Sequence, residues 1–398
     1  MITQADEFNS LCDRLAQAEA IAFDTEFLSE ASYRPQLCLL QFATVDEVVA
    51  VDPLAVHDLS RWWELMADPD LLVIIHGGRE EIRFCLREGN CTPQNLVDVQ
   101  IAEGLLSRGY PLGYSQLVQR VTGRSVHGKH TRSDWSRRPL SSDQVRYALE
   151  DVEHLPEVWK RQLKNLQKQG RGDWARAECE RFVANLADEP RRGDWRRING
   201  SQRLSRREMA ILERLHDWRD REAEARDRPP RFIFRDDLLI EIAKIQPDTA
   251  EELHHVRGLE RNNFRRHTDA ILNAVQQGKA VSEAELPRKN VVDHSLPDTE
   301  ALGKLLSIAL ANRCAEQSVS TSLVGTTADL HDLIRWHVHQ KRQGPPPKLM
   351  QGWREEVCGD LLADLMDGKV TLRVTDPTSD CPLVFEAYRG EYTARGQC

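Results

Sequence analysis

Residues 20–27 read AIAFDTEF, an apolar run that leads into two acids separated by one residue. Residues 20–24 are typical of a buried β-strand, and the spacing of Asp24 and Glu26 puts both side chains on one side of it. Carboxylates at the exposed end of a strand cost little to desolvate and can share a hard cation such as Mg²⁺ or Mn²⁺. Because this spacing also arises by chance where a strand becomes a loop, the pair alone favours an ordinary structural interpretation.

Outward from this strand, the first 160 residues alternate between apolar strands and helical segments. We expect further strands at residues 37–43, 47–51 and 71–76, and helices at 6–17, 80–88 and 141–159. The strand at 71–76 is apolar throughout, as a strand covered on both faces of a sheet must be. The alternation predicts an α/β domain.

Two further polar groups belong to these segments. Tyr147 and Asp151 are four residues apart and therefore share a helix face, where a phenol could orient a water beside a carboxylate that binds a cation. Residues 76–82 (HGGREEI) combine a strand end, a glycine turn and a helix that opens with acids. Acidic residues in the first turn of a helix often only interact favourably with the helix dipole. Neither of these two groups therefore indicates a functional site by itself.

Taken in order, these groups resemble the DEDD superfamily of 3′–5′ exonucleases, in its tyrosine-bearing subgroup, and within it the bacterial ribonuclease D family. Residues 33–37 (YRPQL) and 131–140 (TRSDWSRRPL) strengthen the resemblance, which is close over about residues 1–200. The resemblance implies an α/β ribonuclease H-like exonuclease domain, with a mixed sheet flanked by helices. It also implies that Asp24, Glu26 and Asp151 are metal-binding acids and that Tyr147 orients the attacking water.

The fourth metal-binding position departs from the family pattern. Where the family has aspartate, five residues after the histidine at the strand end, this chain has Glu81. The added methylene moves the carboxylate by about 1 Å or more, and misplacement on that scale can cost about 10²-fold in rate. We expect Glu81 to act as the substitute ligand, with Asp98 as the next candidate and His76 in a structural role.

The remaining chain resembles two all-α HRDC-type domains, which are small nucleic-acid-binding modules. The first carries Trp218-Arg219, RPPRF (228–232) and VRGL (256–259), and the more divergent second carries LVGTTADL (323–330) and GWR (352–354). The predicted organisation is an exonuclease domain at 1–170, a basic helical linker at 171–203, HRDC domains at 204–280 and 297–375, and a tail at 376–398.

The 398 residues carry a net charge of −9, which by itself would argue against a nucleic-acid partner. The positive charge is concentrated, however: residues 160–207 hold 14 basic and 6 acidic residues. Lysine and arginine neutralise phosphates without regard to sequence, although arginines before the last motif could instead pair with nearby acids. Our candidates for RNA contact are Lys129, Arg132, Arg137 and Arg138.

The other features of the composition narrow the class of protein. The nine cysteines include no C-x-x-C pair, which argues against a disulfide partner or a zinc ribbon and fits the cytoplasm. No apolar run approaches the roughly 18 residues that a membrane span requires. We expect a monomer.

The leading interpretation is a metal-dependent 3′–5′ exoribonuclease that trims structured RNAs such as tRNA precursors at a free 3′ end. The resemblance implies two Mg²⁺ or Mn²⁺ ions per active site and release of nucleoside 5′-monophosphates. Two alternatives stay open. One is a DNA 3′–5′ exonuclease of the same fold, because the acids do not distinguish the sugars. The other is a non-catalytic nucleic-acid-binding protein whose site decayed at Glu81.

Overall fold

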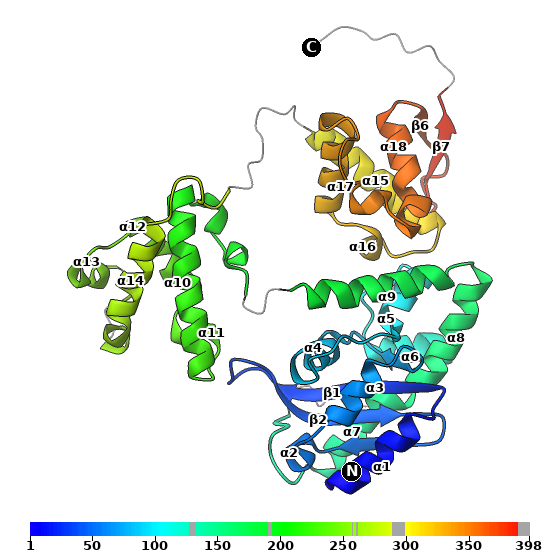
Figure 1. Cartoon of the computed structure of the whole chain (residues 1–398). Coiled ribbons are helices and arrows are strands. Elements are labelled where there is room, and N and C mark those ends of the chain that lie inside the picture. The colour runs from blue at the N-terminus through cyan, green and yellow to red at the C-terminus, as the bar shows by residue number, and fades with distance from the viewer. Residues whose placement is uncertain (127–132, 190–192, 257, 260–261, 289–298, 389–398) are drawn as a thin grey trace.

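The computed structural model describes residues 1–126, 133–189, 193–256, 258–259, 262–288 and 299–388. They form an α/β domain followed by two largely helical domains (Figure 1). No helix in these ranges is both long and apolar enough to cross a membrane.

The α/β domain is built on one mixed five-stranded sheet. In chain order its elements are α1 (Ala5–Leu15), β1 (Ala20–Leu28), β2 (Gln36–Ala43), β3 (Val48–Val51), α2 (Pro53–Val56), α3 (Ser60–Met66), β4 (Leu72–Ile75), α4 (Arg79–Glu88), β5 (Leu96–Asp98), α5 (Val99–Leu106), α6 (Tyr114–Thr122), α7 (Ser142–Glu153), α8 (Leu155–Lys168) and α9 (Gly172–Ala187). The strand order is β3-β2-β1-β4-β5, with β1 antiparallel to β2 and parallel to β4. The expected mixed sheet flanked by helices is thereby confirmed.

Two element boundaries differ from the sequence expectation, and one strand was not expected. β1 runs on to Leu28 because its second half continues to pair with β2, so Asp24 and Glu26 lie within the strand and not at its end. The helical pattern at 141–159 divides at His154 into α7 and α8, where Pro156 in the first turn of α8 lacks the N–H that a continuous helix would use. The short strand β5 completes the sheet, and we did not expect it from the sequence because it has only three residues.

Helix α9 lies within residues 171–203, which the sequence analysis assigns to a linker, yet it packs on the α/β domain. Its buried residues Cys179 and Val183 join the hydrophobic clusters that also contain α5 and β5 side chains. Arg171, just before the helix, donates to the backbone carbonyl of Leu105. The charge-rich composition therefore belongs to an amphipathic helix with one buried face.

The two following domains are mainly helical, as expected. The first holds α10 (Arg206–Ala225), α11 (Pro230–Ile233), α12 (Asp236–Ile245), α13 (Ala250–His254) and α14 (Thr268–Lys279), and the second holds α15 (Glu300–Glu316), α16 (Thr321–Val324), α17 (Thr327–Ile334), α18 (Asp360–Met366), β6 (Val370–Val374) and β7 (Leu383–Ala387). Short helical turns lie at Trp195–Arg197, Ser201–Arg203, Asn262–His267, Arg335–His339, Lys348–Met350 and Glu355–Gly359. β7, in the predicted tail, pairs antiparallel with β6, so the second domain ends in a hairpin.

The two helical domains attach to the α/β domain in different ways. The second shares a hydrophobic core with it across α9, which Figure 1 shows between the two bodies. The first is held by polar contacts to the β1–β2 loop: the hydroxyl of Tyr33 donates to Asp220 at 2.6 Å, and Arg34 pairs with Glu224 at 2.7 Å. The exposed Arg34–Glu224 pair adds little stability, so this attachment is the weaker one.

Candidate active site

The acidic residues singled out in the sequence come together from three elements. β1 carries Asp24 and Glu26, α7 packs across β1 and β2 and brings Asp151, and α4 brings Glu81 in its first turn. Burial raises the pKa of Asp24 well above its usual range, and the charges of the other three carboxylates raise it further. Charges act this strongly only over short distances, so Asp24 lies within reach of the other three carboxylates.

The other acids of the cluster are also hard to ionise. Burial, with the charges of neighbouring carboxylates, raises the pKa of Glu26 to about 8. Burial likewise raises the pKa of Glu81 and of Asp151 to about 7, against the effect of hydrogen bonds from Thr25 and Tyr147 respectively. Several carboxylates held in mutual repulsion are stabilised when a divalent cation binds among them.

The donor set fits such a cation. All four groups offer carboxylate oxygens, which Mg²⁺ and Mn²⁺ prefer. Among the described residues, no group of three or more His, Cys, Asp or Glu side chains is arranged so that it could hold a metal ion as it stands. Cation binding at these acids therefore requires their side chains to move or water molecules to complete the coordination, and Mg²⁺ usually keeps several of its waters.

Tyr147 lies beside the carboxylates on the same face of α7 as Asp151. Its phenol donates to the Asp151 carboxylate, and burial together with the nearby negative charges raises the pKa of the phenol above its usual range. Its ring lies 6.3 Å from that of Trp135, measured between centroids, and Trp135 is buried. The phenol is thus neutral and oriented, and Trp135 is a packing residue with no face free for a base.

Glu81 is the most deeply buried of the four acids. Only 5% of its surface is exposed, and one carboxylate oxygen accepts a hydrogen bond of 2.5 Å from the hydroxyl of Thr25. Thr25 lies on β1 between Asp24 and Glu26, so this bond ties the α4 carboxylate directly to the strand. The longer side chain of glutamate is therefore used to reach the strand.

Asp98, the next ligand candidate, is occupied elsewhere. Its carboxylate caps α5 by accepting from the backbone N–H of Gln100 at 2.8 Å. It also accepts from the backbone N–H groups of Gly77 at 3.0 Å and Gly78 at 3.3 Å. Asp98 thereby fixes the glycine turn that starts α4, and it acts on the site through the position of Glu81.

Tyr114, at the start of α6, also lies in this region, although no motif in the sequence points to it. Its hydroxyl donates to the backbone carbonyl of Glu150 at 2.6 Å, and its ring meets His76 edge-on at 5.6 Å. His76 hydrogen-bonds the carbonyl of Leu112 at 2.9 Å, in keeping with its expected structural role. Burial raises the pKa of Tyr114, and the nearby Asp151 charge adds to the rise. Only the folded chain reveals this proximity, because no spacing in the sequence relates Tyr114 to the acids.

The structure gives Arg138 a structural role in place of the predicted contact with nucleic acid. Its guanidinium forms an ion pair with the buried Asp52, with a hydrogen bond of 2.6 Å, and donates to the carbonyls of Cys38 and Trp135, both at 2.8 Å. These bonds hold the segment before α7 against the sheet. Its donors are consequently engaged with the protein and not free for phosphate.

The other three basic candidates for RNA contact are Arg137, Lys129 and Arg132. Arg137 is exposed, while Lys129 and Arg132 lie outside the described residues. RNA contact stays a prediction for these three residues, whereas the donors of Arg138 are engaged within the protein.

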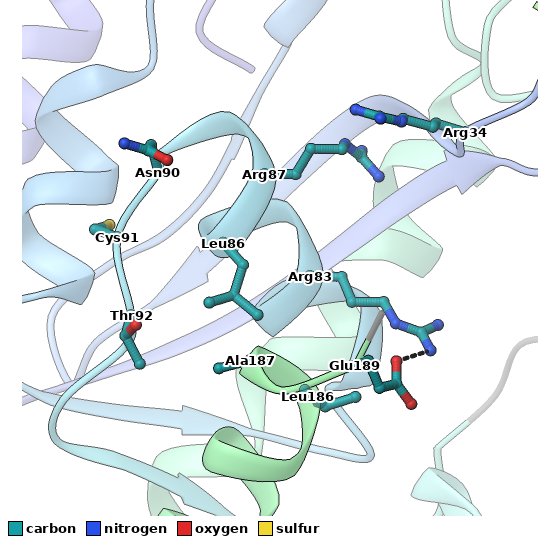
Figure 2. A pocket seen from close by; sticks show the side chains of 10 residues that line it. All are labelled: Arg34, Arg83, Leu86, Arg87, Asn90, Cys91, Thr92, Leu186, Ala187 and Glu189. Carbon is teal, nitrogen blue, oxygen red and sulfur yellow. Dashed lines mark hydrogen bonds and ion pairs between the residues drawn. The ribbon is translucent and has the colours of Figure 1, made fainter. Parts of the chain in front are cut away.

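A basic cavity of about 530 Å³ lies elsewhere, between α4 and the end of α9 (Figure 2). Arg34, Arg83 and Arg87 line it together with apolar side chains such as Leu186. Each arginine is already paired with a glutamate, as in the 2.6 Å contact between Arg83 and Glu189. None of the four clustered acids lines this cavity, so it is separate from the candidate active site. The charges of its arginines are balanced by the paired glutamates.

Comparisons with known proteins agree with this architecture. Residues 1–167 match the family described as 3′–5′ exonuclease, residues 208–275 the HRDC domain, and residues 301–362 the C-terminal HRDC domain of ribonuclease D. The ribonuclease D of Gluconacetobacter diazotrophicus is 34% identical over 381 residues, which are 94% of each chain, and that of Nitrobacter hamburgensis is 32% identical. The crystal structure of Escherichia coli RNase D superimposes with a TM-score of 0.82 at 29% identity, covering 92% of this chain and 98% of that one.

The similarity extends over nearly the whole length of both chains, and it includes the exonuclease domain and both helical domains in the same order. The resemblance seen in the motifs is thereby confirmed, and with it the fold class and the enzymatic class. This chain belongs to the ribonuclease D family of 3′–5′ exoribonucleases.

Proposed function

We propose that the cluster of Asp24, Glu26, Glu81 and Asp151 binds divalent cations, Mg²⁺ or Mn²⁺, and is the catalytic centre. The observation that carries this proposal is the convergence of four carboxylates from β1, α4 and α7, where the charges of Glu26, Glu81 and Asp151 raise the pKa of Asp24, because such repulsion is relieved when cations bind. When bound, a pair of such ions supplies Lewis acidity at the attacking water and at the leaving oxygen of the terminal phosphodiester.

The side chains divide the remaining work. Asp24, whose pKa is raised by the charges of all three other carboxylates, would hold a cation. Tyr147 orients the attacking water, since its phenol is neutral and is itself held by Asp151. Glu81 would be the fourth acidic ligand and would bind a cation either directly or through a water molecule. The hydrogen bond from Thr25 fixes the orientation of its carboxylate.

We further propose that the substrate is RNA with a free 3′ end, such as a tRNA precursor, and that a monomer in the cytoplasm acts on it. The similar Escherichia coli enzyme is described as an exoribonuclease involved in structured RNA processing. A substrate of that kind suits a chain whose catalytic domain is followed by two HRDC domains, because an extended RNA can contact more than one of them.

The test is a Mg²⁺-dependent digestion of a 3′-labelled RNA and of the DNA of the same sequence. We expect release of nucleoside 5′-monophosphates from RNA, loss of activity with EDTA, and loss in Asp24→Asn, which keeps the shape of the side chain but not its charge. Faster digestion of DNA would favour the DNA exonuclease. Binding without digestion of either substrate would contradict the catalytic proposal.

A further inference from the structure

Gln41 lies directly beside the proposed cation site. It is the cross-strand partner of Asp24 in the antiparallel β1–β2 ladder, and residues directly opposite one another in such a ladder project from the same face of the sheet. α7, which carries Tyr147 and Asp151, packs over β1 and β2. Gln41 is therefore next to the carboxylate that interacts with all the others.

The side chain of Gln41 is fully buried, with 0% exposure, and its hydrogen-bonding groups are not satisfied. Neither Nε2 nor Oε1 has a partner among the residues that the structure describes. Gln162, which is also buried, differs in its nitrogen: its Oε1 likewise has no partner among the described residues, but its Nε2 donates to the carbonyl of Val99 and to Glu103, both at 3.0 Å. An amide without partners destabilises a folded protein, so its presence needs a reason.

The strand itself does not call for a polar residue at this position. Leu39 and Ala43, which project from the same face of β2 as Gln41, are fully buried and apolar, so an apolar side chain would suit this position as well. The amide is instead suited to an interaction that forms only when the neighbouring site is filled. Polar groups that contact the ligands of a metal, and not the metal itself, commonly fix the orientation of those ligands.

We propose that Gln41 is a positioning residue for the cation site. Its Nε2 donates to one oxygen of the Asp24 carboxylate and leaves the other for the cation. Its Oε1 accepts from a water molecule that enters with the ions. This inference rests on the proposed function, since it concerns the same carboxylates, and it assigns to β2 a part in a site otherwise built from β1, α4 and α7.

Mn²⁺ binding in the absence of RNA tests the proposal, with free Mn²⁺ measured by electron paramagnetic resonance. The variant Gln41→Met keeps the length of the side chain and removes the amide, and its affinity for Mn²⁺ should fall about 10- to 100-fold. Gln162→Met is the matched control, because it alters a buried glutamine whose amide bonds to α5, and its affinity should equal that of the wild type.

Thermal unfolding separates positioning from packing. The cation-free Gln41→Met protein should be at least as stable as the wild type, because an unsatisfied amide is gone, and Mn²⁺ should raise its Tm less. If Gln41→Met binds Mn²⁺ as tightly as the wild type, the inference is wrong while the cation site stands. If the wild type itself binds no Mn²⁺, the proposed function fails. Should Gln41→Met not fold, Gln41→Asn, whose shorter amide falls short of Asp24, must show the same loss of affinity.

Discussion

The ion pair between Arg354 and Glu178 predicts how the second helical domain is held. The two side chains are only 4% and 2% exposed, and Arg354 Nη1 lies 2.8 Å from Glu178 Oε2. Arg354 also donates to the backbone carbonyls of Val324 at 2.8 Å and Leu323 at 3.0 Å. The variant Arg354→Met keeps most of the volume of the side chain and removes the charge together with all of these donors.

The expected cost is set by what remains around Glu178. Removing one partner of a buried ion pair typically costs about 3–5 kcal/mol, because the other charge stays buried. Here Arg181 still pairs with Glu178, and the indole N–H of Trp353 still reaches it at 3.3 Å. We therefore expect the free energy of unfolding of this part of the molecule to fall by about 3 kcal/mol, the lower end of that range.

The assay is urea unfolding followed by tryptophan fluorescence. The stacked rings of Trp174 and Trp353, 5.6 Å apart between centroids, lie on the two sides of this contact and report on its opening. The control is the double variant Glu178→Met/Arg354→Met, in which no charge is left buried, and it should recover most of the lost stability. Digestion of a short RNA well below the transition should be unchanged in both variants, because neither residue belongs to the acidic cluster.

Two results would refute this reasoning. A loss of less than about 1 kcal/mol in Arg354→Met would mean that the pair is solvated in solution, as surface pairs are. A double variant less stable than Arg354→Met would mean that the charge of Glu178 stabilises the contact even without its arginine.

Three further predictions concern the acidic site. Glu81→Asp should keep or raise the rate of RNA digestion, but it should lower the free energy of unfolding by about 1.5–3 kcal/mol because the hydrogen bond from Thr25 is lost. The control Glu81→Gln should be almost inactive. If Glu81→Asp is almost inactive as well, the site needs the longer acid. Tyr147→Phe should lower kcat by about 10²-fold with KM little changed, because the hydroxyl only orients water, and an unchanged kcat would exclude that role. The cation-free protein should lose stability as the pH rises from about 5 to about 8, since Glu26, with its pKa raised to about 8, holds a proton in the folded state that the unfolded state has released. Adding Mg²⁺, or the substitution Glu26→Gln, should make the Tm less dependent on pH over this range. If the stability of the cation-free protein instead rises from about pH 5 to about pH 8, the pKa of Glu26 is not higher in the folded state than in the unfolded state.

The sequence by itself indicated the family and the mixed sheet, and it singled out the acids and the tyrosine that we propose as the site. Apolar periodicity is a local property, so the strands and helices could be predicted from short windows of the chain. Asp24 and Glu26, and likewise Tyr147 and Asp151, lie within one element each, so their spacing alone put each pair on one face. The charge distribution, by contrast, did not distinguish an amphipathic helix such as α9 from a linker.

Only the tertiary structure decided what the long-range partners of these residues are. Thr25 donates a hydrogen bond to Glu81, and Asp52 forms an ion pair with Arg138. The amide of Gln41 lies beside Asp24 without a hydrogen-bond partner among the described residues. These relations join segments that are distant in the chain, and an arginine or glutamine has the same place in the sequence pattern whether it is buried or solvated. Burial makes the difference, because a polar group taken out of water must find a partner within the fold or in a bound ligand.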